Sequence, residues 1–168
     1  MEQIIQLNSQ AKLSEHFTLG EMTKSNSHPE VYNIPSHEAI ANLKRLCGWL
    51  EVLRERYNAK YGVGEEPIRI NSGYRSPQLN RAIHGNANSN HMTGCACDIR
   101  VIGMEQALRY AVILMDYADE SKLEFDELLI EKRSASPLGS SKNRYGAIWL
   151  HFAVRPSGNR RKVLFLSV

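Results

Sequence analysis

One stretch of the sequence has a clear helical period, and it constrains the fold more than any other feature. Apolar residues recur at spacings of three and four from Ile40 to Tyr57, with charged residues between them. Ser36 precedes the stripe as an N-cap, and Glu38 adds negative charge in the first turn. Gly62 follows the stripe and ends the helix. The sequence therefore predicts one long amphipathic helix in this region.

The rest of the chain shows shorter patterns, with helices early and strands late. We expect helices over 77–83 and 104–117, a loop over 84–90, and strands over 68–70, 96–101, 125–131, 147–154 and 163–168. Because helix and strand do not alternate as in βαβ units, the order predicts an α+β fold with helices packed on a small antiparallel sheet.

Length and composition place the chain among ordinary globular domains. It has 168 residues, 42% of them hydrophobic and 23% charged, which fits a single domain over 1–168. Within it, residues 1–35 are polar and their apolar pattern is interrupted. We expect them to form an N-terminal extension that packs on the core. Phe17, Leu19 and Met22 are the expected anchors of this extension.

Charge and apolar runs exclude several classes of protein. The net charge of +3 is too small for a nucleic-acid signature, although Arg155–Lys162 holds four of the positive charges. The longest apolar run, Ala111–Met115, is far below the ~18 residues that a membrane-spanning helix needs.

No secretory signal is visible at the start, so we expect synthesis in the cytoplasm. We read the three cysteines as reduced thiols and the protein as a monomer.

The segment Ser89–Asp98 carries the chemistry. It places His91 in a polar loop and Asp98 in a strand, with Gly94 between them. A loop that turns at a glycine and feeds a strand can bring both side chains to one metal ion, for which His nitrogen and Asp oxygen are normal ligands. Asp98 also stands among apolar neighbours, where a carboxylate needs a cationic partner. That partner is a zinc ion or, alternatively, a nearby arginine such as Arg75.

His151 is the best candidate for a third ligand. In the strand pattern A-I-W-L-H-F-A-V it shares one face with Trp149, beside a large aromatic wall. Three protein ligands would leave the fourth position of a zinc ion open, as in catalytic sites. A histidine on a strand is also compatible with a hydrogen-bonded core residue, so spacing alone leaves both interpretations open.

These motifs together resemble the zinc D-Ala-D-Ala carboxypeptidase family, which includes phage endolysins and shares its fold with the hedgehog signalling domain. The resemblance rests on the zinc segment, the preceding Ser-Gly-Tyr-Arg-Ser, the following Trp-x-His and the opening L-S-E-H-F-T-L-G-E-M-T, at 89–98, 72–76, 149–151 and 13–23. It covers roughly Leu13 to Val154 and implies a fold of the hedgehog/DD-peptidase type.

The resemblance also implies roles for individual residues. His91, Asp98 and His151 match the family's ligands for one zinc ion per chain. Arg75 matches the arginine that holds a substrate carboxylate or stabilises the oxyanion, and a guanidinium fork suits either task. Ser89 matches a residue that lines the substrate site, and it is equally compatible with merely supporting the loop; Trp149 is a further expected substrate contact.

The general base is where the sequence departs from the family pattern. Relatives carry a glutamate a few residues before the last histidine, whereas Ile148, Trp149 and Leu150 stand there in this chain. We expect Glu131 to replace it, provided that a hairpin returns this residue beside Trp149. Glu127 is the second candidate because it has the same side-chain parity along the strand. The segment between the strands, 132–146, is basic and polar, and reads as a lid, a wall-binding loop or a solvated excursion.

The resemblance implies a zinc peptidase that hydrolyses peptidoglycan stem peptides. Carboxypeptidase and endolysin-type endopeptidase activities both occur in the family, and the missing signal favours a phage or prophage lysis enzyme released onto the cell wall. The alternative is a non-catalytic, hedgehog-like zinc module that recognises a wall fragment or a protein partner. The absent close-spaced glutamate supports this alternative.

Overall fold

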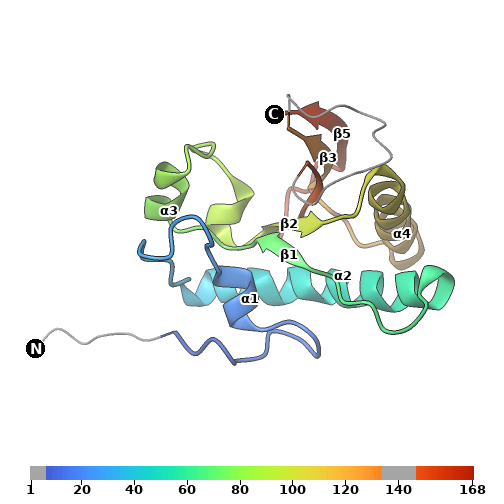
Figure 1. Cartoon of the computed structure of the whole chain (residues 1–168), viewed down its shortest axis with the longest axis horizontal. Coiled ribbons are helices and arrows are strands. Elements are labelled where there is room, and N and C mark those ends of the chain that lie inside the picture. Colours follow the sequence, from blue (N-terminus) through green and yellow to red (C-terminus); the bar gives the residue numbers. More distant parts are fainter. Residues whose placement is uncertain (1–6, 134–146) are drawn as a thin grey trace, which may run out of the picture.

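A computed structural model of the chain describes residues 7–133 and 147–168. Residues 1–6 of the expected N-terminal extension and most of the 132–146 insertion lie outside this described part. The elements, labelled in Figure 1, are α1 (Leu19–Thr23), α2 (His37–Tyr61), β1 (Ile70–Ser72), α3 (Pro77–Ala82), the 3-10 turn η1 (Asn90–Thr93), β2 (Ala96–Arg100), α4 (Met104–Ser121), β3 (Glu127–Lys132), β4 (Ile148–Ala153) and β5 (Lys162–Ser167).

The strands form one sheet of five, in the order β1-β2-β4-β3-β5. The pairs β1–β2, β2–β4 and β3–β4 are antiparallel, whereas β5 runs parallel to β3. The predicted α+β fold is therefore confirmed, with a sheet that is mostly antiparallel. The run Arg155–Lys162 carries the chain from β4 past β3 to the edge of the sheet.

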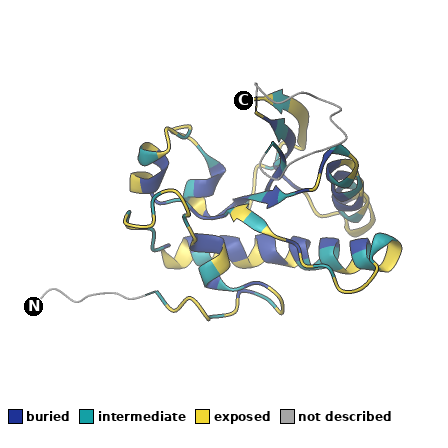
Figure 2. Ribbon diagram, viewed as in Figure 1, coloured by how far each residue is buried: buried dark blue, intermediate teal, exposed yellow. Residues whose placement is uncertain are grey.

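The α2 helix forms where its sequence predicts. Ser36 is the N-cap, and its hydroxyl accepts a hydrogen bond from the Ala39 backbone at 3.1 Å. The apolar stripe is buried, and Leu43, Leu46 and Leu50 are inaccessible to solvent. Figure 2 shows buried residues running along α2, β2 and α4, while β5 at the sheet edge is mainly exposed. Every described helix falls short of the length or the hydropathy that crossing a membrane would demand.

Strand alternation gives the sheet two different faces. One face presents apolar side chains, such as Ile99, Leu150 and Ile130, to the core that α2 and α4 share. These three residues stand opposite one another across the paired strands. The neighbouring positions point the other way and include Asp98 and His151. The face away from the long helices therefore carries the polar residues of the candidate site.

Most of the predicted elements differ by one or two residues at a boundary, and the first strand and the second long helix differ most. The first strand, expected over 68–70, begins at Ile70, because Ile68 is buried in the core and pairing with β2 begins opposite Ile99. The second long helix continues a full turn beyond the expected end, to Ser121. Both differences leave the candidate ligands where the sequence placed them.

The segment before α2 packs on the core through the predicted anchors. Phe17, Leu19 and Met22 are all buried. Glu51 of α2 holds this segment, since its carboxylate accepts hydrogen bonds from the Ser14 hydroxyl at 2.6 Å and from the His16 backbone at 2.7 Å. Residues 1–35 were predicted as an extension of the same domain, and that division stays a prediction.

Candidate metal centre

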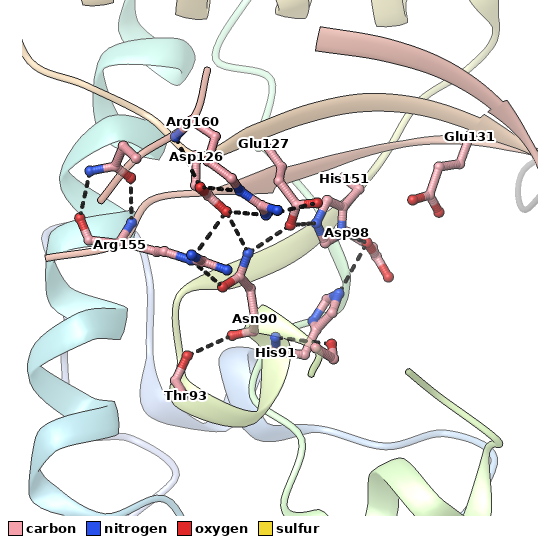
Figure 3. Close-up of polar contacts among 12 residues, drawn as sticks. Asn90, His91, Thr93, Asp98, Asp126, Glu127, Glu131, His151, Arg155 and Arg160 are labelled. Carbon is pink, nitrogen blue, oxygen red and sulfur yellow. Dashed lines mark hydrogen bonds and ion pairs between the residues drawn. The ribbon is translucent and has the colours of Figure 1, made fainter. Parts of the chain in front are cut away.

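Three elements bring His91, Asp98 and His151 together. Asp98 on β2 stands directly opposite His151 on β4, and η1 places His91 beside both. One possible ligand atom from each residue lies within 4.8 Å of the other two. Figure 3 shows the three side chains converging from these separate segments. Both histidines are buried and Asp98 is partly buried.

The turn before β2 fixes His91. The Ser89 hydroxyl accepts a hydrogen bond from the His91 backbone at 3.2 Å and caps η1. Gly94 ends the turn in the left-handed region, with φ of 75°. The His91 ring is held by the Gly73 carbonyl, which lies 2.7 Å from Nδ1 and must accept a hydrogen bond from it. The other ring nitrogen, Nε2, is therefore a bare lone pair.

That lone pair points at a carboxylate. His91 Nε2 is buried, lies 3.3 Å from Asp98 Oδ1, and has no hydrogen-bond partner. Two electron-rich atoms in this position repel each other unless a cation lies between them. Burial also lowers the pKa of His91, which keeps the ring neutral as metal ligation requires. The residues present therefore fit a metal ion.

The Asp98–His151 pair is charged. Burial alone would raise the pKa of Asp98, but the hydrogen bond with His151 and the charge of that ring oppose this, and the pKa is held far below its usual range. Burial would likewise lower the pKa of His151, but hydrogen bonds to Asp98 and Glu127 raise it well above its ordinary value. Two imidazoles and an ionised carboxylate form a donor set consistent with one zinc site.

Both candidate glutamates lie on the same face of β3 as the site. Glu131 stands directly opposite Trp149, as the expected hairpin requires, and its Oε2 accepts a hydrogen bond from the indole Nε1 at 2.8 Å. Burial and the nearby Asp98 raise the pKa of Glu131, which suits a group that exchanges protons.

Glu127 has a different environment. Its Oε1 lies 3.3 Å from His151 Nε2 and accepts a hydrogen bond from the Asn90 amide at 2.6 Å. The hydrogen bond with His151 is the main cause that lowers the pKa of Glu127. The two carboxylates lie four residues apart along β3, on either side of Leu129, and their pKa values are thus shifted in opposite directions.

The group lies in a cleft of about 960 Å³. Arg75, Ser89 and Trp149, the residues expected to contact substrate, all line it. The Arg75 guanidinium donates a hydrogen bond to Asn80 at 3.3 Å, and its Nε is buried without a partner. Because Arg75 lines the cleft, its guanidinium is placed to meet an anionic group of a ligand. Arg75 was the alternative partner expected for Asp98, but Asp98 contacts the two histidines instead.

Sequence reasoning missed a polar network behind the site. Asp126 is completely buried and pairs with Arg160 at 2.8 Å and with Arg155 at 3.2 Å. The Asn90 amide donates to both Asp126 and Glu127, as Figure 3 shows. An ionisable residue inside the expected strand 125–131, directly after Phe125, was the available signal, because a buried carboxylate needs cationic partners.

Comparisons with known proteins agree with this geometry. The sequence model of the family described as Peptidase M15 matches residues 15–120. A zinc D-Ala-D-Ala carboxypeptidase of Streptomyces albus G is 30% identical over 96 residues, which are 57% of this chain. The chain covers only 35% of the length of that relative. The family match includes His91 and Asp98 and ends before β3 and β4, so His151 joins the site on structural grounds.

Proposed function

Because this chain belongs to the Peptidase M15 family, we propose that it is a zinc-dependent peptidase that hydrolyses peptidoglycan stem peptides. One observation carries the proposal: the buried lone pair of His91 faces the ionised Asp98 and His151 in an open cleft. The similarity to a zinc D-Ala-D-Ala carboxypeptidase supports the choice of metal and substrate. The bond cleaved is that of a D,D-carboxypeptidase or of an endolysin-type endopeptidase.

His91, Asp98 and His151 would hold the zinc ion, leaving the cleft side open. When bound, zinc lowers the pKa of the attacking water and polarises the scissile carbonyl. Net hydrolysis adds the water oxygen to the carbonyl carbon and breaks the carbon–nitrogen bond. One water proton must therefore reach the leaving amine.

Glu131 is the proposed carrier of that proton. Burial and Asp98 raise its pKa, which makes the protonated form easier to reach and suits one carboxylate that acts first as base and then as acid. The indole of Trp149 binds Oε2 and leaves the other oxygen, Oε1, for the water. Because Trp149 holds one oxygen, the carboxylate is already oriented before the substrate binds.

Arg75 is the proposed anion partner in the cleft. Its guanidinium lines the cleft beside the proposed metal ligands, so it would bind a carboxylate of the substrate or stabilise the developing oxyanion. Ser89 and Trp149 line the same cleft and would contact the peptide. The desolvated guanidinium favours substrates with a negative charge near the scissile bond.

The test pairs metal content with catalysis. We expect one zinc ion per purified chain, and release of new amines from purified peptidoglycan by the wild type. Glu131→Gln should keep the zinc and lose at least about a hundredfold in rate, as expected for loss of a general base. The matched control is Glu55→Gln, an exposed glutamate on α2 that should behave as the wild type.

The same experiment decides against the non-catalytic alternative. A hedgehog-like binding module would contain zinc and release no amines in any variant. Absence of zinc from the wild type would overturn the metal site itself.

A further inference from the structure

The two ring nitrogens of His151 have different partners. Nδ1 lies 3.0 Å from Asp98 Oδ1, and the same oxygen lies 3.3 Å from the bare Nε2 of His91. One nitrogen of each histidine therefore lies close to Asp98 Oδ1. The opposite nitrogen of His151, Nε2, lies 3.3 Å from Glu127 Oε1. Glu127 thus contacts His151 from behind, on the side away from the other ligands (Figure 3).

We propose that Glu127 is a positioning residue, which accepts a hydrogen bond from His151 Nε2–H and so presents Nδ1 to the metal. This inference rests on the proposed zinc site. A histidine ligand commonly donates its other N–H to a carboxylate, which fixes the tautomer and makes the ring a better ligand. Glu127 fills that role here from β3, because it contacts the ring nitrogen of His151 that faces away from Asp98.

The position of Glu127 is itself firmly held. On β3 it pairs with Ala153, two residues from His151 along β4, so its side chain reaches the ring diagonally. Its Oε1 also accepts a hydrogen bond from the Asn90 amide at 2.6 Å, and Arg160 lies 3.6 Å from Oε2. The side chain is 14% exposed, so water competes little for these contacts.

Asn90 connects this support to the rest of the network. Its amide oxygen accepts a hydrogen bond from Arg155 Nε at 2.9 Å, and its amide nitrogen also donates to the buried Asp126 at 2.8 Å. Since Asn90 immediately precedes His91, one residue ties the support of His151 to the turn that carries His91.

These contacts separate Glu127 from Glu131. A general base needs a free oxygen on the cleft side of the ligands, whereas Oε1 of Glu127 is shared between His151 and Asn90. Glu131 accepts its hydrogen bond from the Trp149 indole at Oε2 and lies further along β3. In this proposal Glu127 orients the ligand His151, and Glu131 transfers the proton.

The test measures zinc affinity by competition with a chelator. Glu127→Ala should weaken zinc binding 10- to 100-fold, the usual cost of losing such a support. Glu127→Gln keeps an oxygen that accepts the His151 hydrogen bond, and it should recover most of the affinity. Glu131→Gln and the exposed Glu55→Ala are the matched controls and should bind zinc as tightly as the wild type.

A second measurement needs no substitution. Long-range nitrogen–proton correlation spectra of the zinc-loaded wild type report which nitrogen of His151 carries the proton. We expect the proton on Nε2, and a proton on Nδ1 would overturn the inference.

The outcomes also separate this inference from the proposed function. Unchanged zinc affinity in Glu127→Ala overturns the inference, whatever the rate of hydrolysis. A wild type that binds zinc but leaves peptidoglycan intact, with Glu127→Ala weakened as expected, overturns the peptidase and supports the positioning role. A wild type that binds no zinc overturns both.

Discussion

Trp149 and Glu131 face each other across β3 and β4, and the indole Nε1–H donates to Glu131 Oε2 at 2.8 Å. The close-spaced glutamate expected before His151 is absent, and in the proposed function Glu131 takes its place. Hydrogen bonding from the indole favours the ionised carboxylate and opposes the rise in pKa that burial causes. The hydrogen bond of Trp149 thereby limits how far the pKa of Glu131 rises.

Replacing Trp149 by Phe removes that N–H and keeps an aromatic wall. The pKa of Glu131 should then rise further, and the acidic limb of the kcat/KM–pH profile should move upward by on the order of one pH unit. In the Glu131→Gln background the same substitution should add little to the loss of rate, because the two residues act through one contact. An acidic limb that stays in place would show that the hydrogen bond does not tune the base.

Zinc should stabilise the fold through Asp98. A ligand at about a thousand times its Kd adds roughly 4 kcal/mol to the free energy of unfolding. We therefore expect zinc to raise the Tm of the wild type by several degrees and a chelator to reverse the rise. Asp98→Ala should lose this zinc-dependent increment, whereas Asp116→Ala, an exposed aspartate on α4, should keep it. Equal zinc-induced shifts in both variants would contradict the assignment of Asp98 as a ligand.

The elements that the sequence predicted best are those whose pattern is local. The stripe from Ile40 to Tyr57 predicts α2 because neighbouring turns of one helix must face the same core. By contrast, the parallel pairing of β5 with β3 depends on where the chain crosses the sheet, and no local pattern records it. The shift of β1 from Ile68 to Ile70 has the same origin, since the register with β2 decides it.

The candidate site divides in the same way. His91 and Asp98 stand seven positions apart in one specific segment, so motif and resemblance together identified them. The contact between Glu127 and Asn90 joins residues that are 37 positions apart, and it depends on strand register and on the course of a loop. Strand parity placed Glu127 on the correct face, but parity alone did not distinguish a base from a support.

The buried Asp126 should make stability dependent on acid pH. Burial alone would raise the pKa of Asp126, but hydrogen bonds from Arg160 and Asn90 lower it from 3.8 to about 2. A carboxyl whose pKa is lowered on folding stabilises the protein above its unfolded pKa, and this contribution fades as the pH falls from about 4 to about 2.

Asp126→Asn should accordingly lower the free energy of unfolding by about 2 kcal/mol at neutral pH. The difference from the wild type should shrink at pH values near 3, in urea unfolding experiments at both pH values. Asp116→Asn is the exposed control and should unfold as the wild type does at either pH. A difference that is the same at both pH values would mean that Asp126 acts through packing and not through its charge.

Two glycines on neighbouring elements should respond to alanine in opposite directions. Gly94 has φ of 75° at the end of η1, and an added Cβ would be forced against the Ala39 carbonyl oxygen. Left-handed strain and overpacking together should lower the free energy of unfolding by roughly 2–4 kcal/mol in Gly94→Ala. Gly48 lies inside α2 with nothing within 4 Å of an added Cβ, so Gly48→Ala should stabilise the protein by roughly 0.5–1 kcal/mol. Urea unfolding of both variants checks the pair, and a Gly94→Ala midpoint equal to that of the wild type would show that the turn carrying His91 does not need its glycine.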